Sequence, residues 1–532
     1  MRLTEQQQEI LENFSRWIDM KINAFAGTWK TTMLKLLVEN NPNKKFLILV
    51  FNRSVKEELT RKFPSNADVF TVHGLAYNKL IWQLNLKNIS SEKWLIPQVI
   101  SEFKVEYEIA QFYMNVLSAY FNSSENIIDE KVVIDLIKND DNLSSFYNTY
   151  SWSISLTKLI KAMKKTFENM INGLRKISYW WYLKYFQLNI NKLTKDMNYD
   201  AVMLDEWQDT NYVSLSIFNQ IPWQKVIVWD THQWIYGWRW AINAMKSLKY
   251  DNFYLSTSFR INKDTASKWD FILKNYKLEK KTLNAYFDQW GDRNFKTCHI
   301  FRSNAWLIKR ISEMKNYEKF NLTRKVNDIF QVALELNKVV LYYVTWKNSY
   351  LEMVENRIKI IALEHRNEEE FWDYIEYVLD DYELVSNWKL IHNIDILRVY
   401  DKALNSIDAK SNVFLSTAHT VKWLEFDEVM IENDFINIYK KLAVTFVEKR
   451  HWKISEVKEV FYNPKKNTIP IMRSIIEEVN LIYVAVTRAI KDLKINSSAV
   501  KLLLSTPKEQ FESALESEIK SLKSVSWASI AK

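Results

Sequence analysis

The chain has 532 residues, 47% of them hydrophobic and 26% charged, which excludes a disordered protein and allows roughly two to four globular domains. Its single cysteine excludes an internal disulfide framework and any cysteine-rich zinc or iron–sulfur site. The net charge of +9 is compatible with nucleic acid as a partner but is too small to identify one.

The sequence shows no sign of a membrane or secretory segment. No uninterrupted apolar run approaches the roughly 18 residues that a membrane span needs. The first residues, Met-Arg-Leu-Thr-Glu-Gln-Gln-Gln, are polar and lack the apolar core of a signal peptide. We therefore expect a cytoplasmic protein without a membrane partner, either a monomer or a transient oligomer.

Glycine is unusually rare in this chain and tryptophan is unusually frequent, with 5 and 22 residues. Glycine ordinarily makes up about 7% of a protein. Several tryptophans stand where turn chemistry favours glycine. Because some bacterial lineages read the UGA codon as glycine, a standard translation of such a gene would write tryptophan at glycine positions. We interpret many of these tryptophans in that way; the alternative is a genuinely tryptophan-rich, functionally decayed protein.

Helix and strand patterns alternate along the first part of the chain. A helix over Glu5–Phe14 and a β-like run over Met20–Asn23 lead into a helical run over Thr31–Glu39. Strands of the buried type, with a helix between the first two, are expected at Phe46–Phe51, Val69–Val72, Ala201–Leu204 and Lys225–Val228. This βαβ rhythm predicts a parallel sheet covered by helices.

A second α/β region begins after about residue 265, with expected strands at Thr297–Phe301, Val413–Ser416 and Glu428–Ile431 and helices at Asn304–Lys315 and Glu478–Thr487. The predicted organisation is a first α/β domain over 1–80 and 196–265, a helical insertion over 81–195, a second α/β domain over 266–314 and 401–500, a helical insertion over 315–400 and a tail over 501–532.

The segment Asn23-Ala-Phe-Ala-Gly-Thr-Trp-Lys-Thr-Thr32 lies between a predicted strand and a predicted helix. A phosphate-binding loop belongs at such a place, because the free N–H groups of a helix N-terminus attract anions. Lys30 would reach the β- and γ-phosphates of a nucleotide, and Thr31 would hold Mg²⁺. Trp29 departs from the pattern, because the backbone must approach phosphate closely there. The residues expected around the nucleotide are Ala26, Gly27, Thr28, Trp29, Thr31 and Thr32.

A second acidic motif follows the predicted strand at Ala201–Leu204. Asp205, at the carboxyl end of that strand, suits Mg²⁺ held through water, and Glu206 suits a base that orients an attacking water. Acids also occur at strand ends by chance, but the phosphate loop earlier in the chain favours the functional interpretation.

These two motifs and several others, in order from residue 3 to about 495, resemble those of UvrD/Rep-type superfamily 1 DNA helicases, most closely the helicase region of F-box DNA helicases. The resemblance implies two RecA-like motor domains with ATP and Mg²⁺ between them. Leu3-Thr-Glu-Gln-Gln7 resembles the adenine-reading Q motif, so Gln7 would contact adenine. No F-box is expected ahead of the motor, because the Q motif begins at residue 3.

The resemblance also implies roles for residues in the remaining motifs. At the nucleotide, Gln233 would sense the γ-phosphate, Phe259 would stack on adenine, Glu425 would meet the ribose, and Arg260 and Arg488 would stabilise the transferring phosphoryl group. The residues that would face DNA are Phe51, Asn52, Thr71, His73, Tyr236, Trp238, His419 and Lys422.

The sequence departs from the family pattern at four tryptophans that stand where the family has glycine: Trp29, Trp229, Trp240 and Trp423. The expected activity is ATP-driven 3′→5′ movement on single-stranded DNA with unwinding of duplex junctions, in DNA repair or recombination. If Trp29 and Trp423 are genuine, an inactive DNA-binding scaffold derived from a helicase is the alternative. A translocase that strips proteins from DNA would use the same residues.

Overall fold

The computed structural model describes residues 3–81, 84, 96–206, 210–233, 249–286, 295–379, 381–448, 453–462 and 470–530. The chain divides into two compact units, Met1–Ser256 and Thr257–Lys532. No helix in these described ranges combines the length and apolar character required to cross a bilayer.

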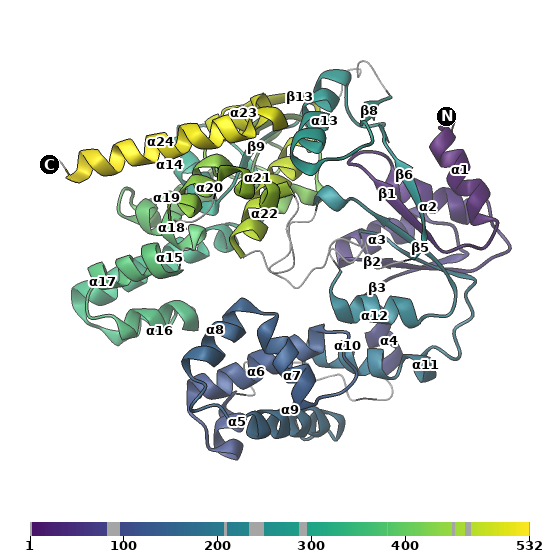
Figure 1. Ribbon diagram of the computed structural model, residues 1–532, viewed down its shortest axis with the longest axis horizontal. Helices are drawn as coiled ribbons and strands as arrows, with labels where there is room; N and C mark the ends of the chain where they lie inside the picture. The colour runs from purple at the N-terminus through teal and green to yellow at the C-terminus, as the bar shows by residue number, and fades with distance from the viewer. Residues whose placement is uncertain are drawn as a thin grey trace. The chain divides into compact units, whose positions relative to one another are not determined.

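The first unit is built on a six-stranded parallel sheet in the order β3-β2-β4-β5-β1-β6 (Figure 1). Every residue of β2 is buried, and its side chains alternate between two apolar cores, one on each face of the sheet. Strands covered on both faces read as continuous apolar runs, as this one does. The strands are β1 (Met20–Ala24), β2 (Phe46–Val50), β3 (Ala67–Thr71), β4 (Ala201–Leu204), β5 (Gln224–Trp229) and β6 (Asp251–Leu255).

The helices of the first unit form two groups (Figure 1). One group lies next to the sheet, and the other is the helical insertion that follows α4 in the chain. The first group comprises α1 (Glu5–Phe14), α2 (Lys30–Glu39), α3 (Arg53–Lys62), α4 (Val72–Leu80) and α12 (Tyr212–Gln220). The second comprises α5 (Ile96–Phe103), α6 (Tyr107–Asn122), α7 (Glu130–Lys138), α8 (Asp141–Thr149), α9 (Leu156–Ile171), α10 (Tyr179–Leu188) and α11 (Ile190–Leu193).

The second unit holds a five-stranded parallel sheet in the order β10-β11-β9-β12-β13 and a short parallel pair, β7 with β8. Its strands are β7 (Thr257–Ser258), β8 (Asn284–Ala285), β9 (Thr297–Phe301), β10 (Asn321–Leu322), β11 (Val413–Thr417), β12 (Phe426–Ile431) and β13 (Ala489–Ile495). Its helices are α13 (Lys263–Lys277), α14 (Asn304–Glu313), α15 (Val326–Thr345), α16 (Asn356–Glu364), α17 (Glu368–Asp373), α18 (Tyr382–Ile391), α19 (Ile396–Ser406), α20 (Ile438–Glu448), α21 (Ile454–Tyr462), α22 (Pro470–Val486), α23 (Ser498–Ser505) and α24 (Phe511–Ile530).

The predicted α/β class with parallel sheets is confirmed. Three edge strands, β6, β10 and β13, were not among the predicted strands, and neither was the short pair of β7 and β8. β6 begins with the exposed pair Asp251-Asn252, and β13 has two lysines and an aspartate among its apolar residues. Charged and polar residues are usual on edge strands, since they discourage pairing with other chains. The same residues make these strands hard to distinguish from surface segments.

Three of the tryptophans have a left-handed backbone conformation. Among the described residues, six non-glycine residues have positive φ, and three of these are tryptophan, a residue type that occurs 22 times in 532 positions. Trp29 lies in the phosphate-loop segment; Trp17 and Trp346 follow the ends of α1 and α15. Glycine is the usual residue in a left-handed position after a helix. Trp229 and Trp423 do not have positive φ, and Trp240 lies outside the described residues.

We expect the native protein to carry glycine at positions 17 and 346. The left-handed conformation costs an ordinary L-residue roughly 1–2 kcal/mol. The indoles are partly exposed, 45% for Trp17 and 61% for Trp346, and their ring contacts are to Phe14 and Lys44 and to Tyr342 and Tyr343. We expect the relief of backbone strain to exceed the loss of these partly exposed contacts. Trp17→Gly and Trp346→Gly should each raise the free energy of unfolding by about 1 kcal/mol. Mass spectrometry of native tryptic peptides checks the residues directly; tryptophan at both positions would contradict the expectation.

Candidate nucleotide-binding site

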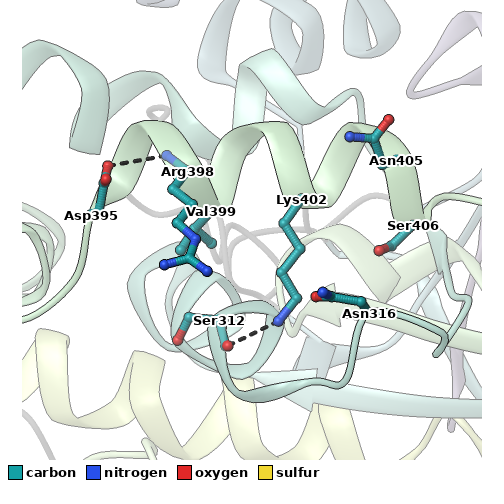
Figure 2. A pocket seen from close by; sticks show the side chains of 8 residues that line it. All are labelled: Ser312, Asn316, Asp395, Arg398, Val399, Lys402, Asn405 and Ser406. Carbon is teal, nitrogen blue, oxygen red and sulfur yellow. Dashed lines mark hydrogen bonds between the residues drawn. The ribbon is translucent and has the colours of Figure 1, made fainter.

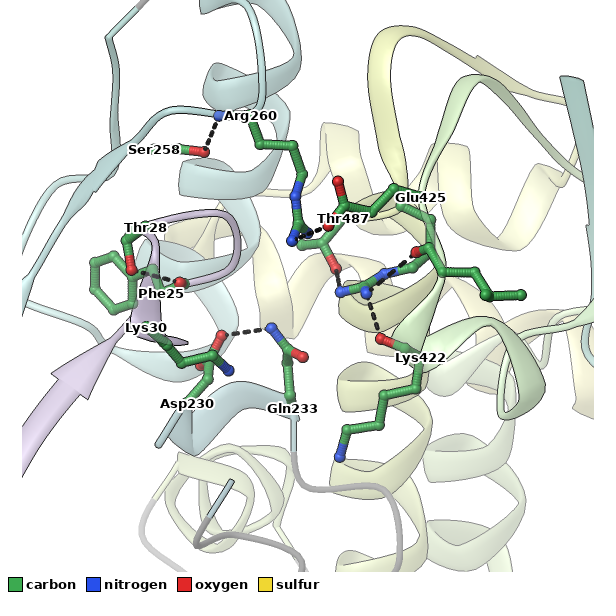
Figure 3. A network of polar contacts seen from close by, with 12 residues as sticks. Phe25, Thr28, Lys30, Asp230, Gln233, Ser258, Arg260, Lys422, Glu425 and Thr487 are labelled. Carbon is green, nitrogen blue, oxygen red and sulfur yellow. Dashed lines mark hydrogen bonds and ion pairs between the residues drawn. The ribbon is translucent and has the colours of Figure 1, made fainter. Parts of the chain in front are cut away.

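The loop between β1 and α2 forms the turn expected of a phosphate-binding loop. Thr28 closes it by donating from its hydroxyl to the carbonyl of Phe25 at 2.8 Å (Figure 3). Gly27 has φ +73°, and Trp29 has φ 60° and ψ 45° immediately before the first residue of the helix, Lys30. Two left-handed residues so close together let backbone N–H groups converge on one side, which suits an anion.

Three neighbouring strands bring their carboxyl ends to this loop, since β4, β5 and β1 are adjacent in the sheet. The Lys30 ammonium lies 2.9 Å from one oxygen of Glu206 and 3.0 Å from the other. The Thr31 hydroxyl donates to Asp205 at 3.2 Å. The predicted grouping of Lys30, Thr31, Asp205 and Glu206 is therefore present in the first unit.

Strand β5 lies between β4 and β1 in the sheet, and Asp230 follows its last residue. Asp230 was not among the predicted site residues. The side-chain amide of Gln233 donates to Asp230 at 2.8 Å, and the backbone N–H of His232 donates to the other Asp230 oxygen at 2.9 Å (Figure 3). Asp230 is fully buried. Its position after an apolar strand, like that of Asp205, is a signal that could have identified it.

The site carries an excess of negative charge. Burial acts to lower the pKa of Lys30, but the carboxylates of Glu206, Asp230 and Asp205 outweigh it and hold the pKa above its usual value. Burial, with the Glu206 carboxylate, raises the pKa of Asp205. One cation thus faces three acids in a buried place, which favours the arrival of a further cation.

Mg²⁺ fits this donor set. The Thr31 hydroxyl and the Asp205 carboxylate lie side by side, and Mg²⁺ bound with a nucleotide ordinarily takes only one or two protein oxygens together with phosphates and waters. No group of three or more His, Cys, Asp or Glu side chains that could form an all-protein metal site occurs in the described ranges. The residues therefore suit a metal that arrives with phosphate.

The backbone of Glu206 is left-handed, with φ +55°. This conformation is costly for a glutamate, and such outliers persist where surrounding contacts hold them. Here the Lys30 ion pair and the hydrogen bond from the Glu206 N–H to Asp205, at 3.0 Å, fix the residue. The carboxylate is thereby directed toward the loop.

Gln7 has a structural role that its motif did not reveal. Its side-chain oxygen accepts from the Thr4 N–H at 3.0 Å, and its own N–H donates to the Thr4 hydroxyl at 3.2 Å. Together they form a capping box at the start of α1. The spacing Thr-x-x-Gln is the signal for it. The neighbouring Gln6 is bonded through its amide to Ser256 at the end of β6.

In the second unit, Arg260 and Glu425 form an ion pair with each other (Figure 3). Phe259 is only 3% exposed, and its ring centroid lies 4.8 Å from that of Tyr286. Glu425, predicted to meet the ribose, and Arg260, predicted to stabilise the transferring phosphoryl group, are thus neighbours in the structure. The ring predicted to stack on adenine packs against a tyrosine.

Arg488 is buried, and its guanidinium bonds to the backbone around it. It donates to the carbonyl of Val484 at 2.9 Å, to the hydroxyl of Thr487 at 2.8 Å and to the carbonyl of Lys422. The arginine therefore joins the end of α22 to the turn that follows β11. These contacts give Arg488 a structural role within the second unit.

Residues 77–499, well over half of the chain, match the UvrD-like helicase C-terminal domain family. The chain belongs to the UvrD-like helicases. It is 26% identical over 536 residues to F-box DNA helicase 1 of Gallus gallus, covering 94% of this chain and 50% of that protein. It is 25% identical over 562 residues to F-box DNA helicase protein 1 of Schizosaccharomyces pombe, covering 94% and 58%.

A probable DNA helicase II homolog of Mycoplasma genitalium is 22% identical over 353 residues, covering 57% of this chain and 49% of that protein. This UvrD-like chain therefore spans about half the length of the curated relatives it matches. The predicted resemblance is confirmed at the level of the family.

Two of the residues predicted to face DNA are helix caps in this UvrD-like chain. Asn52 accepts from the N–H of Val55 at 2.8 Å at the start of α3, and Thr71 accepts from the N–H of Gly74 at 2.9 Å at the start of α4. Both caps stand at carboxyl ends of strands, where ligands bind to open parallel sheets. Phe51 is half-buried beside Asn52.

The other predicted DNA residues lie in several environments. Lys422 is buried, 2% exposed, with its ammonium 5.4 Å from the ring centroid of Trp423, and His419 is half-buried. Tyr236 and Trp238 lie outside the described residues. In the first unit, His73 faces α10: its Nδ1 lies 3.1 Å from the Tyr182 hydroxyl oxygen.

We expect His73 to titrate far below an ordinary histidine. Burial lowers its pKa to about 4, from a usual value near 6.5. The folded state thus releases a proton that the unfolded state keeps, so acidification from about pH 6.5 toward 4 should favour unfolding. NMR titration of the His73 imidazole, assigned with His73→Gln, should give a midpoint near pH 4. A midpoint of 6 or above would contradict this environment.

Proposed function

We propose that the chain is an ATP-dependent DNA helicase that moves 3′→5′ on single-stranded DNA and unwinds duplex at junctions, acting in DNA repair or recombination. The observation that carries the proposal is the pairing of Lys30 with Glu206 and of Thr31 with Asp205 at a loop–helix junction, in a chain of the UvrD-like family. This combination of a loop cation, a metal-suited hydroxyl and two acids is what phosphoryl transfer to water requires.

In this proposal each group at the loop has one task. Lys30 leaves Glu206 to bind the β- and γ-phosphates, which frees the Glu206 carboxylate to orient the attacking water. Thr31 and Asp205 would hold Mg²⁺, and the metal would supply positive charge against the phosphates. Gln233, held by Asp230, responds to the γ-phosphate. Arg260 and Arg488 of the second unit are the further cations that the resemblance assigns to the transferring phosphoryl group.

The proposed substrate is DNA read through its backbone and base faces rather than its sequence. Single-strand motors bind through phosphate contacts and stacking, so we expect salt-sensitive, sequence-tolerant binding.

The test uses the chain with glycine at position 29. We expect ATP hydrolysis that increases when single-stranded DNA is added, and strand separation of a duplex with a 3′ overhang but not of one with a 5′ overhang. Separation of the 5′-overhang substrate alone would refute the polarity. Absence of hydrolysis with DNA present would refute the motor.

A DNA-binding scaffold without ATPase is the second candidate. The observation that favours it is the left-handed backbone of Trp29 beside Lys30, because a bulky residue in that conformation opposes close approach of phosphate. The same ATPase assay, run on the chain with tryptophan at position 29 and on the Trp29→Gly variant, tests this candidate. DNA binding without turnover in the tryptophan chain, together with tryptophan in the native peptide, would support the scaffold, whereas turnover in the tryptophan chain would refute it.

A further inference from the structure

Helix α10 (Tyr179–Leu188) contacts three parts of the first unit that the proposed mechanism uses separately. It packs against α4, which carries His73, against α6 of the helical insertion and against α12, which follows the Asp205-Glu206 motif. Each neighbour is reached through a different polar side chain of α10, namely Tyr182, Lys184 and Gln187.

Lys184 is the central contact. It is completely buried, and its ammonium donates to the carbonyl of Ser123 at 3.0 Å and to the carbonyl of Glu125, and lies 4.4 Å from the ring centroid of Tyr120. These carbonyls follow the C-terminal end of α6, where unpaired carbonyls and the helix dipole favour a cation. Two carbonyls and one ring face surround this buried ammonium, and together they define the geometry of the joint.

The turn that Lys184 holds, residues 123–126, is connected to α12. The Gln187 amide donates to Asn126 at 2.7 Å and to the Ser216 hydroxyl at 3.2 Å. Next to the turn, the Asn122 amide oxygen accepts from the Asn211 side chain at 2.8 Å. Asn211 caps α12 and follows Glu206 by only five positions.

The opposite side of α10 contacts the segment predicted to face DNA. The Tyr182 hydroxyl lies 3.1 Å from His73, and the two rings meet edge to face with centroids 5.6 Å apart. Tyr182 and Lys184 are two residues apart on one helix. One helix therefore carries both the contact to α4 and the contact to the turn beside α12.

We propose that α10 couples DNA binding at α4 to the Asp205-Glu206 motif, with Lys184 as a positioning residue and Tyr182 as its contact to His73. The inference rests on the proposed ATPase function and adds the element through which DNA stimulates it. A joint of buried hydrogen bonds is either made or broken, so it can pass on a shift of α4 instead of absorbing it.

The experiment compares two lysine variants in the chain with glycine at position 29. Lys184→Met should reduce the stimulation of ATP turnover by single-stranded DNA at least fivefold, while the rate without DNA and the Kd for DNA change less than twofold. Lys402→Met is the matched control: the Lys402 ammonium donates to the carbonyls of Ser312, at 3.0 Å, and Met314 at the end of α14 in the second unit (Figure 2). It should leave the stimulation unchanged.

A second variant, Tyr182→Phe, removes only the hydroxyl near His73 and should lower the stimulation about twofold to threefold without changing the basal rate. If Lys184→Met does not fold, the DNA stimulation of ATP turnover in Tyr182→Phe decides whether α10 couples the two sites. Unchanged stimulation in Tyr182→Phe, or basal and stimulated rates that fall together in Lys184→Met, would overturn the proposal by reducing α10 to a structural role. Failure of the proposed function is recognised separately, because the parent chain itself would then show no turnover with DNA.

Discussion

Replacing Trp29 by glycine is expected to raise ATP turnover at least tenfold over the chain with tryptophan. Trp29 has φ 60° and ψ 45° directly before Lys30, a conformation that costs an L-residue roughly 1–2 kcal/mol and that glycine adopts freely. The backbone at this point must also lie against phosphate, where an indole would obstruct the approach. Steady-state ATPase measurements and equilibrium binding of a fluorescent ATP analogue to both chains check the expectation.

Trp29→Ala separates the two causes. Alanine removes the indole but keeps a Cβ, so it should recover part of the nucleotide affinity and leave the backbone strain in place. Turnover in Trp29→Ala equal to that in Trp29→Gly would show that bulk alone matters. Full turnover in the tryptophan chain would refute our interpretation of position 29, and sequencing the native peptide that spans it tests the residue itself.

The grouping of Lys30, Thr31, Asp205 and Glu206 at the candidate nucleotide site could be predicted from sequence because these residues follow local rules. Lys30 opens a helix after a buried strand, and Asp205 ends another, so the parallel sheet brings both to one edge. The helix caps Asn52 and Thr71 follow the same logic. Gln7 was assigned to adenine, whereas its Thr-x-x-Gln spacing also predicts the capping box seen in the structure.

The features that could not be predicted depend mainly on contacts between distant parts of the chain. Nothing local to Lys184 indicates that it is buried against carbonyls some 60 positions earlier, since a lysine within a helix is ordinarily exposed. The same holds for Arg488, whose bond to Lys422 spans 66 positions. Edge strand β13 was missed because its charged residues interrupt the apolar pattern. Long-range polar contacts of this kind have no periodic signature in a sequence.

Lys30→Ala, made in the chain with glycine at position 29, is expected to reduce ATP turnover by about 10³ or more, judged from the loss of a comparable cation in phosphoryl transfer. Lys30 is the ammonium facing Asp205, Glu206 and Asp230, so its removal leaves two buried acids and the largely buried Glu206 to repel the phosphates. Removing one partner of a buried ion pair also costs on the order of 3–5 kcal/mol, so we expect reduced stability of the first unit.

Lys35→Ala is the control for Lys30→Ala, because Lys35 lies on the same helix but is 39% exposed and pairs with Glu39 at 3.3 Å. It should leave turnover and stability nearly unchanged, as exposed ion pairs contribute about 0–1 kcal/mol. DNA binding should survive in both variants, measured by fluorescence anisotropy of a labelled single strand. Retained turnover in Lys30→Ala would remove the loop from the ATP site, whereas lost turnover with intact DNA binding would place the chemistry at Lys30 and the DNA contacts elsewhere in the chain.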